Sequence, residues 1–314
     1  MLRYISQRML IAIGTVFAAS VISFVLVHAT DGSPGAIALG IGALPADIHN
    51  FNQSVGWYDP WVTQYLHWAG QLLHGNLGVS ILDSHDIRED LMARLPVTAS
   101  MAFGGTFFSA VIGVTLGVTA AVRGGIVDRV ISVSSGIAFS LPAFWVGIVL
   151  VYFLAVQKPW LPATGFVSIG EGGVGEWAKS LTLPIAGLVV GGAAGVGRTA
   201  RAAMIDAIQS DHIRTLRAIG TPEWRIRYIH ALRFASVPVV SMLGMQFVLL
   251  FGGSVVAEQL FALPGLGMAS SAAAATHDFP VVQAVVLIAT LVVVVTNLLI
   301  DLAIGALDPK VRVA

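Results

Sequence analysis

A glycine-rich run at residues 192–199 comes closest to a nucleotide-binding motif. It reads Gly-Ala-Ala-Gly-Val-Gly-Arg-Thr, one residue away from the phosphate-binding pattern G-x-x-x-x-G-K-[ST]. That chemistry needs a lysine on the phosphates, in a loop between a buried strand and a helix. Here Arg198 replaces the lysine, and the run ends a long apolar segment. We therefore expect these glycines to serve close helix packing and not nucleotide binding.

Other chemistry-bearing residues are too scattered to form a site. His67 and His74 are seven residues apart, so they share a helix face, but no third metal ligand accompanies them. The chain has no cysteine, which excludes disulfides, thiolate ligands and thiol nucleophiles. No Ser-His-Asp arrangement has local support. We expect no catalytic residue, no metal site and no cofactor in this chain, which is therefore not an enzyme.

The basic stretch 212–233 differs from its surroundings, because the chain is 56% hydrophobic and only 11% charged. It contains two histidines and five arginines: Arg214, Arg217, Arg225, Arg227 and Arg233. Such a cluster can fix membrane orientation, neutralise nucleic-acid phosphates or dock a partner. A short tethered loop with one tryptophan makes nucleic-acid binding the weakest of the three.

The pattern within this stretch predicts two short helices joined by a turn. Gly220 is typical of a helix end, Thr221 of an N-cap, Pro222 of a first helical position and Glu223 of a helix N-terminus. The predicted elbow connects two apolar segments. A short helix held in this way can fit a partner's groove and pass its motion to those segments.

Long uncharged runs predict the elements that carry this elbow. Among the runs of 18 to 28 residues that contain no Asp, Glu, Lys or Arg, six are predicted spans: 9–30, 95–122, 130–157, 180–197, 234–257 and 279–300. About 20 apolar residues cross a bilayer as a helix. The sequence therefore predicts an all-α integral membrane protein with six transmembrane helices. The first run is longer than the apolar part of a signal peptide, so we interpret it as a retained anchor.

The distribution of lysine and arginine predicts the orientation. With the N-terminus in the cytoplasm, 13 of the 17 lie on the cytoplasmic side: Arg3, Arg8, Arg123, Arg129, Arg198, Arg201, Arg214, Arg217, Arg225, Arg227, Arg233, Lys310 and Arg312. This satisfies the positive-inside rule and places both termini in the cytoplasm.

The long external segment, residues 31–94, contains one predicted helix. Asp59 and Pro60 favour its start, and Gly75 its end. Its aromatic side chains share one face: Trp61, Tyr65 and Trp68. That face suits either the membrane surface or packing on a neighbouring span, and the sequence leaves both open.

The span interiors contain no ionisable side chain. Glu258, Asp278 and Asp301 lie at the ends of runs. A proton-coupled carrier should have such groups near mid-membrane. Their absence from the runs favours a pathway whose energy comes from elsewhere.

The elbow resembles the cytoplasmic "EAA" loop of ABC-importer permeases. That loop has Glu-Ala-Ala, three residues, a glycine and later a Leu-Pro or similar pair. Arg214-Thr215-Leu216 stand at the first three positions, Gly220 at the glycine and Val237-Pro238 at the pair. The peptide-permease branch more often has Arg-Thr-Ala there, so Leu216 is a departure.

The whole chain is similar to the dipeptide/oligopeptide permease subfamily. The resemblance covers "GWYDPWVTQYLHW", "GNLGVS", "RLPVTASMAF", "LPAFWVGIVLV", "WLPATGF", "HALRFASVPVVSMLGMQ", "GGSVVAEQLFALPGLG", "HDFPVVQAVV" and "NLLIDLAIGALDPKVR". A departure is "TDGSPGA", where the family has a Pro-Gly-Asp-Pro sequence. The resemblance implies the type I ABC-importer fold in a bacterial inner membrane, with residues 1–94 as anchor helix and external segment. It makes residues 95–307 the transmembrane domain, with a coupling loop at 205–235, and 308–314 a cytoplasmic tail.

The resemblance also implies partners. A second homologous permease, two cytoplasmic ATPases that carry ATP and Mg, and an external substrate-binding protein would complete an importer of di- or oligopeptides that works by alternating access. The implied ATPase contacts, within residues 212–225, are Arg214, Thr215, Leu216, Arg217, Ala218, Gly220 and Glu223. The hypothesised contacts with the binding protein are Trp61, Leu263, Pro264 and Gly265.

Three alternatives stay open at this point. The same machinery could import nickel, glutathione or another small solute. From other classes, the chain could be an ion-coupled carrier, which would work without an ATPase. It could also be a membrane scaffold or receptor, which would need no continuous polar pathway.

Overall fold

The computed structural model describes residues 2–29 and 32–307, and this part of the chain is built of helices. They are α1 (Leu2–Ala29), α2 (Pro34–Leu39), α3 (Pro45–Ser54), α4 (Trp61–Leu73), α5 (Ile87–Arg123), α6 (Gly125–Ser140), α7 (Ala143–Val151), the π-helix η1 (Tyr152–Gln157), α8 (Ile169–Gln209), α9 (Asp211–Ala218), α10 (Glu223–Arg225), the π-helix η2 (Ile226–Ala231), α11 (Leu232–Gly253), α12 (Val255–Leu260), α13 (Leu266–Thr276) and α14 (Phe279–Leu307). The predicted tail 308–314, with Lys310 and Arg312, lies outside the described residues.

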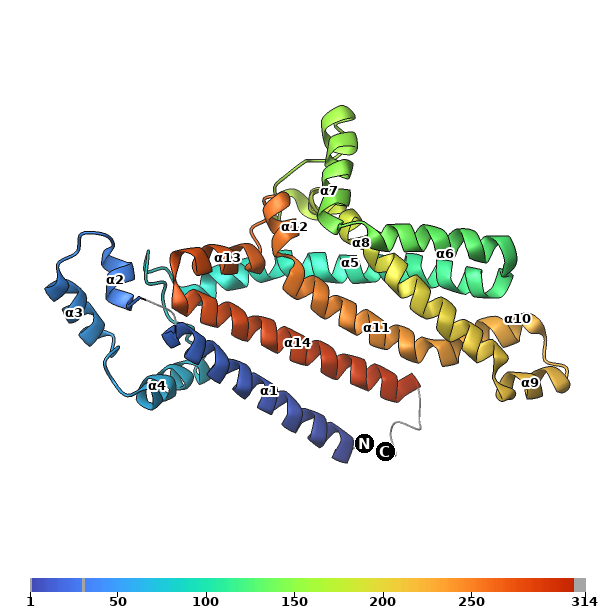
Figure 1. The fold of residues 1–314 in the computed structure, drawn as a ribbon, viewed down its shortest axis with the longest axis horizontal. Coiled ribbons are helices and arrows are strands. Elements are labelled where there is room, and N and C mark those ends of the chain that lie inside the picture. The colour runs from blue at the N-terminus through green and yellow to red at the C-terminus, as the bar shows by residue number, and fades with distance from the viewer. Residues whose placement is uncertain (1, 30–31, 308–314) are drawn as a thin grey trace. The chain divides into compact units, whose positions relative to one another are not determined.

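Five of these helices are long and apolar enough to cross a membrane: α1, α5, α8, the helix from Glu223 to Gly253, and α14. A sixth candidate is a bent pair of segments, Gly125–Ser140 and Ala143–Gln157, which meet at an angle of 92°. Figure 1 shows α7 standing away from the line of α6. By length and composition, the expected six spans are present when this bent pair counts as one span. The helix α8 continues past Arg198 to Gln209.

A straight helix through 130–157 was the wrong expectation, because Pro142 lies within this run. Leu141 adopts an extended backbone with φ −80° and ψ 131°. A proline has no N–H for the helix ladder, and its ring disfavours the helical conformation of the preceding residue. An uncharged run of the right length therefore does not establish a continuous helix.

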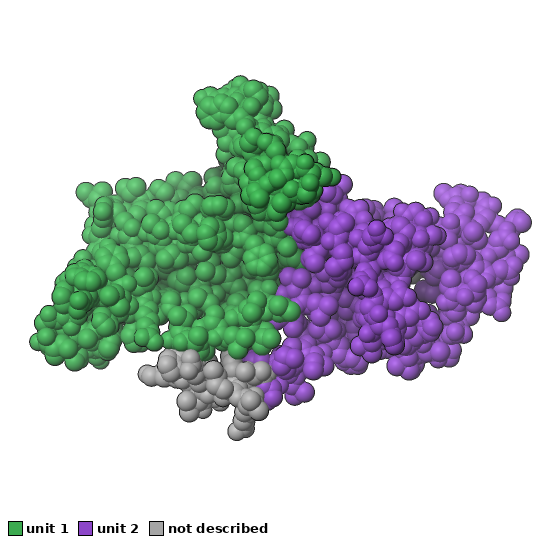
Figure 2. Space-filling model, turned by 180° about the vertical axis from the view of Figure 1, so that it is seen from behind, with its two compact units in different colours: residues 1–4, 98–263, 295–314 green, residues 5–97, 264–294 purple. Residues whose placement is uncertain are grey.

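The chain divides into two compact units, which Figure 2 colours separately. Unit 1 comprises residues 1–4, 98–263 and 295–314. Its organising element is α8, which packs against α6, α7 and α11. Unit 2 comprises residues 5–97 and 264–294.

Within unit 1, α5 and α8 approach each other through glycines. A Cβ added to Gly113 would lie 2.6 Å from the carbonyl oxygen of Ala193 and 2.8 Å from the Cβ of Val196. One turn further along α5, a Cβ on Gly117 would collide with the carbonyl oxygen of Gly197. The run 192–199 is therefore continuous helix, and its interpretation as a packing motif is confirmed.

Within unit 2, the aromatic face of α4 packs on α1. The rings of Tyr65 and Trp68 lie 5.4 Å and 6.1 Å from the ring of Phe24, and the Tyr65 hydroxyl is 2.8 Å from Ser20 Oγ. Of the two alternatives for this face, packing on a span is the one observed. The expected Asp59 cap is wrong, because Pro60 is the N-cap residue and no side chain caps the helix.

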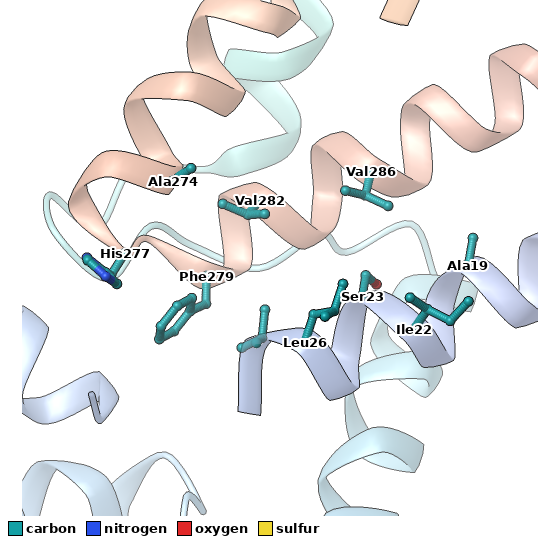
Figure 3. Close-up of a pocket in the computed structure, with 10 residues that line it drawn as sticks. Ala19, Ile22, Ser23, Leu26, Ala274, His277, Phe279, Val282 and Val286 are labelled. Carbon is teal, nitrogen blue, oxygen red and sulfur yellow. The ribbon is translucent and has the colours of Figure 1, made fainter. Parts of the chain in front are cut away.

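The connection between α11 and α14 contains two short helices, α12 and α13. α13 begins at Leu266, directly after the hypothesised contact residues Leu263, Pro264 and Gly265. Asp278 ends this connection in unit 2, and its carboxylate accepts hydrogen bonds from Ser80 Oγ at 2.5 Å and from the Ile81 N–H at 3.3 Å. Beside it lies an apolar cavity of about 430 Å³. Figure 3 shows the cavity between α1 and the start of α14, with His277 at one end.

The glycine contact predicts a large effect from one methyl group. Gly113→Ala places the Cβ against backbone, which cannot move aside, so we expect a loss of about 1–3 kcal/mol in unfolding free energy. The matched control is Gly136→Ala, where a Cβ meets nothing within 4 Å. There the higher helix propensity of alanine predicts no loss and a gain of up to about 1 kcal/mol. SDS-induced unfolding of both variants measures the difference. Equal stabilities would contradict the tight crossing.

Candidate functional site

The elbow forms as a helix, a glycine turn and a second helical segment. After α9, Gly220 adopts φ +82°, and the N–H groups of Gly220 and Thr221 donate to the carbonyls of Arg217 and Leu216, both at 3.0 Å. This pattern is typical of a helix that ends at a left-handed glycine. The expected Thr221 cap is wrong by one residue. Pro222 is the N-cap, since its extended backbone (φ −61°, ψ 138°) leads directly into α10.

The inner face of the elbow packs on the chain's own helices. Ile213 is completely buried in a cluster with Met204 of α8 and Ile226 of η2. Leu216, one turn after Ile213, is half-buried against the same cluster. The bulky leucine at this position therefore fills space inside the elbow, and its side chain is largely withdrawn from the outer surface.

The outer face is braced by ion pairs within the elbow. Glu223 accepts from Arg217 Nε at 2.7 Å and from Arg227 Nε at 3.2 Å, so one carboxylate joins both sides of the turn. Arg214 Nη1 lies 3.1 Å from Asp211 Oδ1, and this pair is far more exposed. Of the remaining predicted contacts, Thr215, Ala218 and Gly220 are exposed.

Large apolar side chains are exposed on the elbow, and the predicted contact residues do not include them. The exposed fraction is 72% for Ile219, 56% for Trp224 and 52% for Tyr228. The guanidinium of Arg225 lies 5.3 Å from the ring centroid of Trp224. Large apolar groups within a charged, connecting stretch are a sequence signal for a contact surface, and this signal was available.

A second charged contact secures α8 where it approaches the elbow. Arg201 of α8 donates two hydrogen bonds to the carboxylate of Asp128 in α6, one of them from Nη2 at 2.6 Å. Bidentate pairs of this kind fix geometry as well as charge. From the sequence alone, Arg201 contributed only to the predicted membrane orientation.

Of the four residues hypothesised to contact the external binding protein, two are exposed and two are buried. Trp61 is 54% exposed, and its ring lies 5.5 Å from His28. Pro264 is also exposed. Leu263 is completely buried and Gly265 is buried, so these two offer no side-chain surface in this structure. Among the residues that the structure describes, no group of three or more His, Asp or Glu side chains could hold a metal ion.

Comparison with known proteins identifies a family. The model described as "Binding-protein-dependent transport system inner membrane component" matches residues 113–313, and the model of its N-terminal region matches residues 1–102.

Three curated relatives illustrate the likeness. The probable peptide ABC transporter permease protein y4tP of Sinorhizobium fredii is 34% identical and covers 98% of this chain and 99% of its own. The oligopeptide transport system permease protein AppB of Bacillus subtilis is 34% identical, with coverage of 99% and 100%. The glutathione transport system permease protein GsiC of Pectobacterium atrosepticum is 33% identical, with coverage of 99% of both chains.

Solved structures show the same fold. A chain of the MetNI methionine ABC transporter, in an inward-facing crystal form, superposes with a TM-score of 0.54 at 23% identity and covers 69% of this chain and 96% of its own. A second crystal form gives a TM-score of 0.56 at 22% identity. With two family models and near full-length relatives in agreement, the chain belongs to the inner membrane components of binding-protein-dependent transport systems, as a permease subunit.

Proposed function

We propose that this permease subunit forms part of the pathway by which an ATP-driven importer moves di- or oligopeptides inward by alternating access. The peptide assignment is supported by the relatives y4tP and AppB, whose names specify peptide and oligopeptide transport. The glutathione permease GsiC keeps glutathione as the second candidate substrate. Family membership favours this importer over the ion-coupled carrier and the scaffold.

The proposed assembly contains a second homologous permease, two cytoplasmic ATPases and an external binding protein. The family description supports dependence on a binding protein, and the fold shared with MetNI supports an ABC assembly. ATP and Mg then act on the ATPases, and this chain holds no cofactor. We place the chain in the bacterial inner membrane with both termini in the cytoplasm, on the strength of its arginine distribution.

The observation that carries the proposal is an elbow that packs firmly on its own helices and exposes large apolar side chains among its ion pairs. Buried Ile213 and the Glu223 ion pairs fix its shape, while Ile219 and Trp224 face solvent. It follows α8 after one residue, Ser210, and continues through η2 into α11. An ATPase bound to it can therefore displace both spans. ATP shifts the conformational equilibrium because it binds the closed ATPase arrangement better than the open one.

Gly220→Val should uncouple ATP hydrolysis from uptake. The φ of +82° at this position is strained for a β-branched residue, so the elbow loses its turn while the spans remain. Gly220→Asn is the control, because asparagine tolerates the left-handed region. Both are measured in proteoliposomes of the complete importer, as peptide uptake per ATP hydrolysed. Unchanged coupling in Gly220→Val would refute the docking assignment.

Trp224→Ala should release the ATPases. Removing an exposed aromatic anchor from a docking surface weakens binding severalfold or more. The chain offers a matched control in Trp160→Ala, since Trp160 is 67% exposed and lies 4.8 Å below the ammonium of Lys158. Retention of ATPase on the tagged permease during detergent washing measures the effect. Equal retention in the two variants would exclude Trp224 from the contact.

The membrane orientation is tested by labelling single introduced cysteines. Because the sequence contains no native cysteine, only the introduced thiol can react. Lys158→Cys should react with a membrane-impermeant maleimide added to intact spheroplasts. Ile126→Cys, at an 80% exposed position in the first turn of α6, should react only after permeabilisation. The reverse pattern would invert the proposed topology.

A further inference from the structure

Polar side chains lie at the middle of two apolar spans in unit 1. Ser109 is central in the uncharged run 95–122, and Gln246 is central in the run 234–257. Both are buried in the structure, with exposed fractions of 0% for Ser109 and 5% for Gln246. Neither has a role in the elbow or in the external contacts. Lipid offers no hydrogen-bond partners at the middle of a span, so these side chains need partners other than lipid.

The two side chains meet at a glycine of a third helix. An ideal Cβ on Gly192 of α8 would collide with both the Gln246 amide nitrogen and the Ser109 hydroxyl oxygen. Gly192 therefore leaves the space in which α5, α8 and α11 bring these polar groups together. At the neighbouring Gly191, a Cβ would meet nothing within 4 Å.

These buried polar atoms have no hydrogen-bond partner in the described chain. They are Gln246 Nε2, Gln246 Oε1, Ser109 Oγ and, one turn before Ser109, Thr106 Oγ1. Six other hydroxyls in the spans behave differently, since each of the six donates to the carbonyl four residues earlier in its own helix: Thr15, Thr115, Thr119, Thr199, Ser241 and Thr290. The Ser109 hydroxyl is instead turned towards the helix junction.

An amide buried in this way needs a ligand that both donates and accepts. Leaving buried polar groups unpaired is destabilising, and native proteins avoid it. Water satisfies both groups, and buried waters bridge polar atoms that do not reach one another. A transported solute does not suit the site, because Gln246 is withdrawn into the contact between helices of one chain.

We propose that a water molecule binds at mid-membrane between Gln246, Ser109 and Gly192, and that it joins α5, α8 and α11 as a hydrogen-bonded junction. The amide of Gln246 holds the water through both its donor and its acceptor. Ser109 Oγ supplies a further contact, and Thr106 Oγ1 lies on the same face of α5. The small Gly192 is required because any side chain there would fill the site.

The direct test is a density map of the complete transporter in lipid nanodiscs, at a resolution that shows ordered water. We expect a peak within hydrogen-bond distance of Gln246 and Ser109, and its loss in Gln246→Leu. If that variant does not assemble, Ser109→Ala serves, with the peak lost or displaced. A direct bond from Ser109 to Gln246 with no peak would overturn the proposal, as would density for a solute.

Stability provides a second measurement with a matched control. Gly192→Ala should lower the apparent Tm of the complex by several degrees, because its Cβ displaces the water and clashes with Gln246. Gly191→Ala should leave the Tm unchanged, since its Cβ enters open space. Combining Gly192→Ala with Gln246→Ala should recover part of the loss. Equal Tm values for the two single variants would show that no such junction exists.

Discussion

The close approach of α5 to α8 is the contact on which the rest of unit 1 depends. Lipid gives helices little hydrophobic reason to associate, so close backbone contact through small residues has to hold them. Gly113 and Gly117 provide this contact by leaving room for the carbonyls of α8. Because α8 also packs on α6, α7 and α11, its position fixes theirs. The same helix ends one residue before the elbow.

The elbow combines two kinds of stabilisation with different purposes. Burial of Ile213 and Leu216 attaches it to the ends of α8 and η2. The charged groups act mainly within the elbow, where Glu223 connects Arg217 and Arg227 across the turn. Exposed ion pairs contribute little to global stability, so their effect here is on shape. The ion pairs of Arg217 and Arg227 thus hold the shape of the surface on which apolar groups are displayed.

The sequence predicted what depends on composition and local rules. Uncharged runs gave the spans, and Gly220 with Pro222 gave the elbow, because these signals act over a few residues. The sequence also contained a signal for the bend between α6 and α7, because Pro142 lies in the run 130–157. A search for uncharged runs misses this signal, because it takes no account of how proline restricts the backbone. The rest needs distant partners. Neither the pairing of Arg201 with Asp128 nor the burial of Leu263 follows from neighbouring residues. Leu216 resembled a surface departure, and only the packing shows it filling the interior.

The π-helical turn η2 has a consequence for insertions and deletions. A π-helix contains one residue more than the α-helical path it replaces, and its wider turn accommodates that residue locally. Each residue of a regular α-helix, by contrast, advances the side chains by about 100°. Deleting one residue between Ile226 and Ala231 would thus restore a regular helix and keep the direction of the elbow relative to α11. Deleting one residue within α11 itself would turn the elbow by about 100° relative to the rest of that span. The six-residue segment is therefore a place where the chain can lose one residue and still present the same docking face.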